Sequence, residues 1–212
     1  MCTTNSDSSG KAVKKGLLKL VIVLNGPPSV GKDTIARAMR EMLGATVQLE
    51  FKEQLFTELS LWSGVPVPEL KARNNDRALK ELPWDKLNGL SVRQGLIHVS
   101  EAIIKPRYGD GYFGVAAASR AEAVIEAGGV PVFSDGGFNV EIQALASAVG
   151  PDVPVLVVRL HRDGCTYDGD SRSYITLSHP SVHLVDAHLV EGDVCHAVQQ
   201  VAGAVLALGT VS

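Results

Sequence analysis

The chain has 212 residues, 45% of them hydrophobic, which is enough to bury the core of one domain that carries small inserted segments. A net charge of −3 argues against the basic surface that nucleic acid polymers require, and an aromatic content of 5% provides few rings for stacking bases. Three scattered cysteines, Cys2, Cys165 and Cys195, are too few for a disulfide framework. We therefore expect a cytoplasmic protein that has no nucleic acid polymer as its partner.

Residues 1–16 are rich in Ser, Thr and Lys and are predicted to form a disordered tail in front of a single domain, residues 17–212. Residues 11–24 superficially resemble a signal peptide, but Lys19 interrupts the apolar run and no small-residue cleavage site follows. No other segment is long enough to span a bilayer, so we expect no membrane partner.

The stretch from residue 20 to residue 39 has the most informative pattern. Leu20–Leu24 is an unbroken apolar run, which is typical of a parallel strand that is buried on both faces. The sequence GPPSVGK follows, and apolar residues then recur at helical spacing from Ile35 to Leu43. A glycine-bounded loop that ends in lysine, between a strand and a helix, is the context in which G-x-x-x-x-G-K binds nucleotide phosphates.

The predicted phosphate loop acts through its backbone N–H groups, which point inward together with the positive end of the helix dipole. Lys32 adds a mobile cation for the outer phosphates. The hydroxyl residue that normally follows the lysine and holds magnesium is replaced by Asp33, with Thr34 one place later, so the magnesium ligands stay open. The residues expected to bind ATP are Gly26, Pro27, Pro28, Ser29, Val30, Gly31, Lys32, Asp33 and Thr34.

Strand and helix patterns alternate along the rest of the chain, and no internal repeat is present. This alternation predicts an α/β fold with a doubly wound, five-stranded parallel sheet. Asn139 is expected to cap one of the helices, which Gly150 would end. The further strands are expected at 45–51, 130–134, 153–160 and 182–190, and the further helices at 114–129, after Asn139, and at 193–208.

Two segments interrupt this alternation. Residues 52–113 read mostly as helix and are too long for a simple crossover, so we expect an inserted subdomain that covers a substrate. Residues 161–180 begin with the polar sequence HRDGCTYDGDSRSY, which a hydrophobic core would not accept, and this sequence predicts a lid.

A second glycine pattern, Gly109, Gly111 and Gly114, matches G-x-G-x-x-G, with Asp135 following at a strand end. This is the pattern of a dinucleotide site, but the residues in front of it include Lys105–Arg107 with a central proline, which is poor material for a buried strand. We prefer a glycine turn that starts a helix, and a nicotinamide-dependent oxidoreductase remains an alternative.

A nucleoside triphosphate on the loop could drive a switch, a motor or a transfer reaction. A guanine-nucleotide switch would need an N-K-x-D motif, which is absent, and a motor would usually place an acidic residue beside Asp135, where this chain has Gly136 and Gly137. Transfer fits better, because it needs basic residues that clamp the acceptor and the moving phosphoryl group. The candidate clamp residues are Arg93, Arg159, Arg162 and Arg172.

Four segments together resemble the deoxynucleoside monophosphate kinases of bacteriophages, a branch of the nucleoside monophosphate kinases with a fold of the P-loop kinase type. The segments are GPPSVGKDT, SVRQGLIHVSEAIIKPRYGDGYFG, VFSDGGFNVE and RLHRDGCTYDGDSRSY, and the resemblance spans residues 20 to about 205. It implies transfer of the γ-phosphoryl group of ATP, with magnesium, to a deoxynucleoside 5′-monophosphate for DNA precursor supply. The location would be the host cytoplasm if a phage encodes the protein.

The resemblance also implies roles for individual residues. Arg93 would bind the acceptor phosphate, Arg162 and Arg172 would close over the transition state, and Asp135 would order magnesium through water. Some relatives carry a basic residue where this chain has Gly137. The full set comprises Lys32, Arg162 and Arg172 as catalytic residues, Lys52, Arg77, Arg93 and Gln94 at the acceptor, and Asp135, Asp33 and Thr34 at the metal.

Other readings of the phosphate loop stay open. The acceptor could be another small metabolite, or the chain could bind a nucleotide without transferring anything. The expected partners are small-molecule nucleotides, and the chain could act as a monomer or a homodimer.

Overall fold

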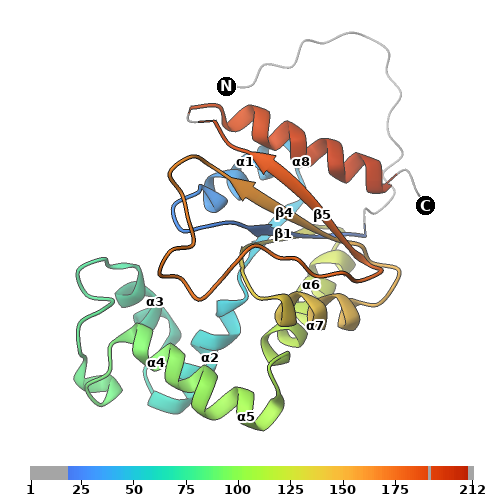
Figure 1. Ribbon diagram of the computed structural model, residues 1–212. Coiled ribbons are helices and arrows are strands. Elements are labelled where there is room, and N and C mark those ends of the chain that lie inside the picture. Colours follow the sequence, from blue (N-terminus) through green and yellow to red (C-terminus); the bar gives the residue numbers. More distant parts are fainter. Residues whose placement is uncertain (1–18, 191, 210–212) are drawn as a thin grey trace.

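Five parallel strands form the centre of the molecule in the computed structural model, which describes residues 19–190 and 192–209 (Figure 1). The strands lie in the order β2-β3-β1-β4-β5, and every neighbouring pair is parallel. The predicted α/β fold with a five-stranded parallel sheet is therefore confirmed. The tail predicted for residues 1–16 lies outside the described residues. The strands are β1 (Val21–Asn25), β2 (Thr46–Leu49), β3 (Val130–Gly136), β4 (Val155–His161) and β5 (Val182–His188).

Strand β1 lies in the middle because it pairs with β3 on one side and with β4 on the other. All five of its residues are buried, as the apolar run predicts for a strand that is covered on both faces. The chain passes to β2 and β3 on one side of β1 and to β4 and β5 on the other. In open parallel sheets, ligands bind at the carboxyl ends of strands where the winding reverses, so the end of β1 is the expected location of a site.

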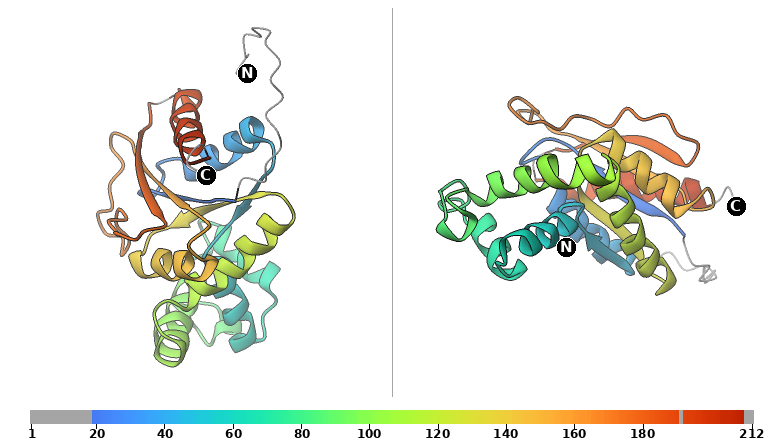
Figure 2. Two further views of the ribbon diagram at one scale, coloured as in Figure 1. Left: turned by 90° about the vertical axis from the view of Figure 1, so that its right-hand side faces the viewer. Right: turned by 90° about the horizontal axis from the view of Figure 1, so that it is seen from below.

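Helices cover both faces of the sheet, as the doubly wound class requires (Figure 2). Helices α1 (Lys32–Leu43) and α8 (Val194–Gly209) pack on one face, and their core includes Ile35, Met39 and Val201. Helices α6 (Tyr112–Glu126) and α7 (Asn139–Val149) pack on the other face. No helix among the described residues is long and apolar enough to cross a membrane.

The inserted segment is helical and extends from one end of the sheet (Figure 1). It has a core of its own, in which Phe56, Leu59, Leu70, Leu87 and Val92 are buried. Its elements are α2 (Lys52–Ser63), α3 (Val67–Asn75), a 3₁₀ turn (Asp85–Leu87), α4 (Val92–His98), the π-helical segment η2 (Val99–Ile104) and α5 (Lys105–Tyr108). The structure thus contains the helical insertion expected at 52–113, and its acceptor-binding role stays a prediction.

The edge strand β2 is shorter than the predicted 45–51. It ends at Leu49 because Phe51 already has helical backbone angles and leads into α2. The prediction that Asn139 caps α7 is wrong, because Phe138 occupies the cap position and Asn139 is the first helical residue. The Asn139 amide instead bonds Thr176, accepting from its backbone N–H at 3.1 Å. The Asn139 side chain thus bonds a residue that is distant in the sequence, and it does not cap its own helix.

The second glycine pattern does not form a dinucleotide site in this structure. The residues before Gly109 form α5, where a dinucleotide site needs a strand, and Gly109–Gly111 is the turn into α6. Gly114 serves the packing of two helices, because a Cβ atom on it would lie 2.2 Å from the backbone oxygen of Glu141 in α7. The preferred interpretation, a glycine turn that starts a helix, is confirmed.

Candidate functional site

The predicted phosphate loop lies at the carboxyl end of β1 and leads directly into α1. Its backbone needs unusual conformations, with a positive φ of 63° at Ser29 and 109° at Gly31. A Cβ atom on Gly26 would lie 2.9 Å from Val30 Cγ1 and 3.0 Å from the Leu160 oxygen, so only glycine fits there. The loop therefore curls tightly in front of the N-terminus of α1, where N–H groups and the helix dipole favour an anion.

Lys32 folds back over this loop. Its Nζ atom donates hydrogen bonds to the backbone oxygens of Gly26 at 2.6 Å and Pro27 at 2.7 Å. Burial lowers the pKa of Lys32 to about 8, and Arg172 contributes in the same direction. The Lys32 ammonium group is thus partly buried and repelled by Arg172, and the negative charge of a bound phosphate would stabilise it.

The three proposed metal residues differ from one another in exposure and in hydrogen bonding. Thr34 is exposed, and Asp33 accepts a hydrogen bond at 3.2 Å from Gln48 of β2. Both carboxylate oxygens of Asp135 are engaged, since Oδ1 accepts from the N–H of Phe51 at 2.7 Å and Oδ2 from that of Lys52 at 3.1 Å. Burial raises the pKa of Asp135, against the lowering effect of these two amides and of the Lys52 charge. Asp135 therefore holds the start of the insertion against the end of β3.

No group of three His, Cys, Asp or Glu side chains in the described ranges 19–190 and 192–209 is arranged to hold a metal ion. Magnesium usually keeps several waters and takes one or two protein oxygens together with substrate phosphates. The oxygens of Asp33 and Thr34 at the start of α1 fit this mode, with Asp135 acting through water. The donor set is thus compatible with magnesium that arrives with its nucleotide.

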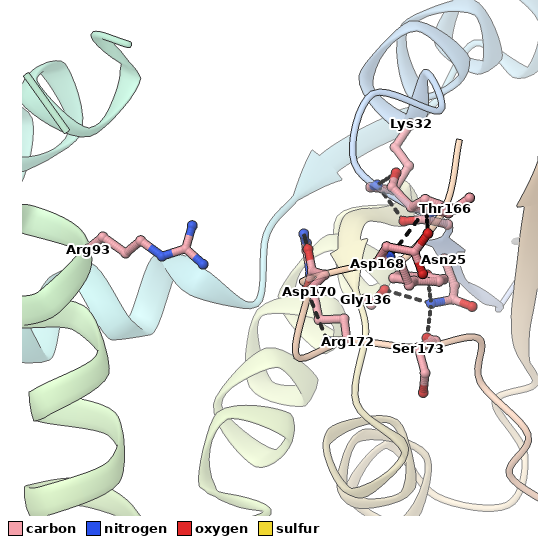
Figure 3. A network of polar contacts seen from close by, with 12 residues as sticks. Asn25, Lys32, Arg93, Gly136, Thr166, Asp168, Asp170, Arg172 and Ser173 are labelled. Carbon is pink, nitrogen blue, oxygen red and sulfur yellow. Dashed lines mark hydrogen bonds and ion pairs between the residues drawn. The ribbon is translucent and has the colours of Figure 1, made fainter. Parts of the chain in front are cut away.

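Asn25, the last residue of β1, fixes the lid segment to the sheet (Figure 3). Its buried Nδ2 lies 3.1 Å from the oxygen of Gly136, 3.0 Å from that of Ser173 and 3.0 Å from the hydroxyl of Tyr167. Its Oδ1 accepts from the N–H of Ile175 at 2.9 Å. One polar side chain at the end of a buried strand therefore joins β1, β3 and the lid.

Arg172 is held beside the phosphate loop by Asp170. Its Nε donates to Asp170 Oδ1 at 2.9 Å and its Nη2 to Oδ2 at 2.6 Å, which is the two-pronged geometry of strong arginine–carboxylate pairs. This pairing lowers the pKa of Asp170 to about 2. The charge of Arg172 also contributes to the lowered pKa of Lys32, so these two proposed catalytic residues interact electrostatically.

A cavity of about 360 Å³ opens next to Arg172, between the sheet and the insertion. Three of the cationic residues that line it come from three different segments: Lys52 at the start of α2, Arg93 on α4 and Arg172 in the lid. Arg93 projects from α4 on the side that faces Asp170 and Arg172 (Figure 3), and its Nη1 lies 3.8 Å from Glu81 Oε1. The other lining residues are Phe51, Leu55, Leu96, Ile97, Ser100, Glu101, Lys105, Phe113, Asp135, Phe138, Glu141, Asp170 and Ser171.

Two predicted acceptor residues do not line this cavity. Arg77 lies in an exposed turn after α3. The Gln94 side chain closes a capping box at the start of α4, accepting from the Ser91 N–H at 2.8 Å. Arg159, one of the candidate clamp residues, forms an ion pair with Asp186 on β5. Of the acceptor set, the structure therefore gathers Lys52 and Arg93.

A second cavity, of about 240 Å³, lies on the other side of the phosphate loop. Arg162 lines it together with Thr34 of α1, so the two lid arginines serve different cavities. Leu189, Val190, Gly192, Asp193 and Val194, from the end of β5 to the start of α8, also line it, and nothing in their sequence had marked them as part of a site. Its position beside Thr34 fits the base and ribose of a nucleotide whose phosphates lie on the loop.

No protein-family model and no curated protein matches the chain. Among solved structures, a gluconokinase from Sinorhizobium meliloti 1021 is 13% identical with a TM-score of 0.41, and the match covers 90% of this chain and 94% of that one. An unliganded sugar kinase from Janibacter sp. HTCC2649 is also 13% identical with a TM-score of 0.41, over 89% and 93% of the two chains. Similarity this low carries no argument about function. The functional argument rests on the site.

Proposed function

We propose that the chain transfers the γ-phosphoryl group of ATP to a deoxynucleoside 5′-monophosphate. The observation that carries this proposal is the gathering of Lys52, Arg93 and Arg172 around one cavity, with Lys32 close enough to Arg172 for their charges to interact. In the proposed reaction, these four cations from the loop, the insertion and the lid act on the phosphate groups of the donor and the acceptor. Such convergence suits a reaction in which two phosphate groups must approach each other despite their like charge.

Each cation has a place in this reaction. Lys32 leaves the loop carbonyls and binds the outer phosphates of ATP, while Arg93 and Lys52 hold the phosphate of the acceptor. Arg172, oriented by Asp170, stabilises the charge on the group in transfer. Enzymatic phosphoryl transfer depends mainly on positioning and electrostatic stabilisation, so no general base is required. Asp33 and Thr34 would supply protein oxygens to a magnesium ion that arrives with ATP, and that ion would neutralise part of the phosphate charge.

The donor nucleotide extends from the loop into the second cavity, where Arg162 meets its base or ribose. This assignment differs from the sequence-based expectation that Arg162 and Arg172 close together over the transition state. In the proposed arrangement, Arg162 supports donor binding and Arg172 acts on the transferred group.

A kinase for another small metabolite is the second candidate. Four cationic and four acidic side chains line the larger cavity, and Lys52, Arg93 and Arg172 among them favour an acceptor that already carries a negatively charged group over a neutral sugar or alcohol. An anionic metabolite and a nucleoside monophosphate would both bind Arg93 and Lys52 through their negatively charged group. Only an assay of each acceptor therefore distinguishes the two functions.

The test is a coupled assay of ADP release with ATP, magnesium and each of the four deoxynucleoside monophosphates in turn. Ribonucleotides, sugar acids and sugar phosphates form a parallel panel. We expect acceptor-dependent ADP release with at least one deoxynucleotide, and its loss in Lys32→Ala, which excludes a contaminating kinase. Turnover only on the metabolite panel would establish the second candidate, and tight ATP binding without any turnover would identify a non-catalytic module.

A further inference from the structure

The larger cavity has two chemically different ends, and this inference, which rests on the proposed function, concerns the end away from the phosphates. Arg93, Ile97, Glu101 and Lys105 all line the cavity at intervals of four residues along α4, η2 and α5. A helix rises about 1.5 Å per residue, so Arg93 and Lys105 are separated by roughly 18 Å along this rod. One end can hold a phosphate while the other meets a different part of the same acceptor.

The π-helical segment η2 explains how one rod can line the whole cavity. At 3.6 residues per turn, a regular α-helix would place Lys105 roughly 120° around the axis from Arg93. The wider turns of Val99–Ile104 remove most of this drift, so Glu101 and Lys105 stay on the cavity side while Ile104 is buried in the core of the insertion. Such insertions often occur at functional sites.

The far end of the cavity offers flat apolar walls and a polar edge. Phe138 is 37% exposed, unusual for a phenylalanine, and it lines the cavity together with Phe113 and Leu96. The Nζ atom of Lys105 lies 5.8 Å from the centroid of the Phe138 ring. An exposed ring beside apolar side chains is a stacking surface for a planar heterocycle.

Glu141, in the first turn of α7, lines this end of the cavity. Within residues 19–190 and 192–209, no hydrogen bond or ion pair satisfies its carboxyl group, although the group is largely buried. The charged groups that act on it are Asp135, Lys105 and Glu101. Burial, with a further contribution from Asp135, raises the pKa of Glu141 to about 7. A ligand that brings hydrogen-bond donors would supply what the pocket does not.

We propose that Glu141 is a specificity residue that selects guanine as the base of the acceptor. Its carboxylate accepts hydrogen bonds from N1–H and from the 2-amino group of guanine, with the base stacked on Phe138. The ammonium group of Lys105 is placed beside the same edge to donate to O6 of guanine, sharing its protons with Glu101, which it already contacts at 2.6 Å.

The choice of guanine follows from the donors and acceptors available. An ionised carboxylate only accepts hydrogen bonds, and lysine only donates them. Guanine is the base whose pairing edge presents two adjacent donors, followed by an acceptor. Thymine presents one donor between two acceptors, while adenine and cytosine each place an acceptor beside their amino group, where it would face the carboxylate.

The experiment compares dGMP with deoxyinosine monophosphate, which keeps N1–H and O6 but lacks the 2-amino group, in wild type and in Glu141→Gln. We expect dGMP to be the best of the four deoxynucleotide acceptors, and deoxyinosine monophosphate to have a KM about 10-fold higher, as expected for one hydrogen bond to a charged group. Glu141→Gln should raise the KM for dGMP by roughly 10- to 100-fold with a small change in kcat. The two purine acceptors should then become nearly equal.

The matched control is Glu126→Gln, an exposed glutamate near the end of α6, which should leave the KM for every acceptor unchanged. Calorimetric titration of dGMP gives a second reading of the same difference in affinity. Because the deoxyinosine comparison needs no variant, it tests the proposal even if Glu141→Gln does not fold.

The outcomes separate this inference from the proposed function. A wild-type enzyme that prefers another base, or that accepts deoxyinosine monophosphate as well as dGMP, overturns the role of Glu141 and leaves the kinase intact. An equal loss for all four acceptors in Glu141→Gln also overturns it, since a merely structural role would have that effect. Absence of ADP release with every nucleotide overturns the proposed function first, and the inference with it.

Discussion

The side chain of Arg172 lies in the space that a side chain at Gly137 would need. A Cβ atom on Gly137 would be 2.5 Å from Cδ and 3.0 Å from Cβ of Arg172, so the stem of the arginine, and not merely its tip, would have to move. The N–H of Ser173 also approaches the Gly137 oxygen at 3.5 Å. The glycine after the strand-end aspartate and the lid arginine thus form one unit, in which one residue makes room for the other.

We predict that Gly137→Ala lowers kcat by roughly 10- to 100-fold, because small displacements of a positioning group carry penalties of this size. The KM for ATP should change little, since Lys32 and the loop are untouched. Steady-state kinetics with saturating ATP measure the effect. Gly203→Ala is a suitable control, because its added methyl group meets no atom within 4 Å in α8 and should leave kcat unchanged.

Lys32→Ala should lower kcat by about 100-fold or more, by analogy with the removal of one preorganised donor from a transition state. The Lys32 ammonium group now donates hydrogen bonds to the carbonyls of Gly26 and Pro27 in the loop. Its loss would leave the outer phosphates without that charge. Lys19→Ala, an exposed lysine just before β1, is the matched control. A variant of Lys32 that retains wild-type turnover would contradict the proposed role of the loop.

Arg172→Ala should lower kcat by roughly 1,000-fold with a modest change in the acceptor KM, within the range of arginine residues that act on transferred phosphoryl groups. Asp170→Asn should produce a smaller loss, because Arg172 would keep its charge but lose the carboxylate that orients it. The ratio of the kcat and KM effects is the decisive measurement. An effect of Arg172→Ala on the acceptor KM alone would show that the residue only binds substrate.

The sequence predicted the sheet and the phosphate loop well, because both depend on local pattern. An apolar run followed by G-x-x-x-x-G-K restricts the backbone of residues 20–34 almost completely, and alternating strands and helices then leave few arrangements. The patterns that mark strands and helix ends predicted the bounds of most other elements to within a few residues. The preference for a turn over a dinucleotide site at Gly109–Gly114 was also correct, because a buried strand cannot easily contain Lys105–Arg107.

The rest of the site depends on contacts between distant segments. Asn25 could have been noticed as a polar residue at the end of a buried strand, but its partners, in β3 and the lid, lie more than 100 residues away. The predicted cap at Asn139 was wrong for the same reason, since its side chain bonds a distant threonine. The Gln94 side chain closes a local capping box, and its acceptor role stays a prediction. Glu141 was part of a resembling segment, yet only the fold shows that it lines a cavity together with residues of α4, η2 and α5.

Gly114→Ala should destabilise the fold by about 2 kcal/mol or more. Alanine is favoured over glycine in a helix by about 1 kcal/mol, but here the new methyl group would meet the Glu141 oxygen at 2.2 Å and Ala144 Cβ at 2.8 Å. Forcing α6 and α7 apart costs typically 1–3 kcal/mol or more, so the clash outweighs the propensity. Urea denaturation measures the difference, and Gly203→Ala, in which only the propensity acts, should be neutral or slightly more stable.

Glu141→Gln should stabilise the free protein at pH 8 and have little effect near pH 4.5. The folded protein raises the pKa of Glu141 from 4.5 to about 7, mainly through burial, with a further contribution from Asp135. Between these two pH values the folded state binds the proton more tightly than the unfolded state, so the contribution of Glu141 to stability falls as pH rises through this window. Above this window, the ionised carboxylate costs the folded protein about 3 kcal/mol, which an uncharged amide avoids. Urea denaturation of both proteins at pH 5, 6, 7 and 8 measures this, and parallel stability curves for the two would show that Glu141 does not titrate in this window.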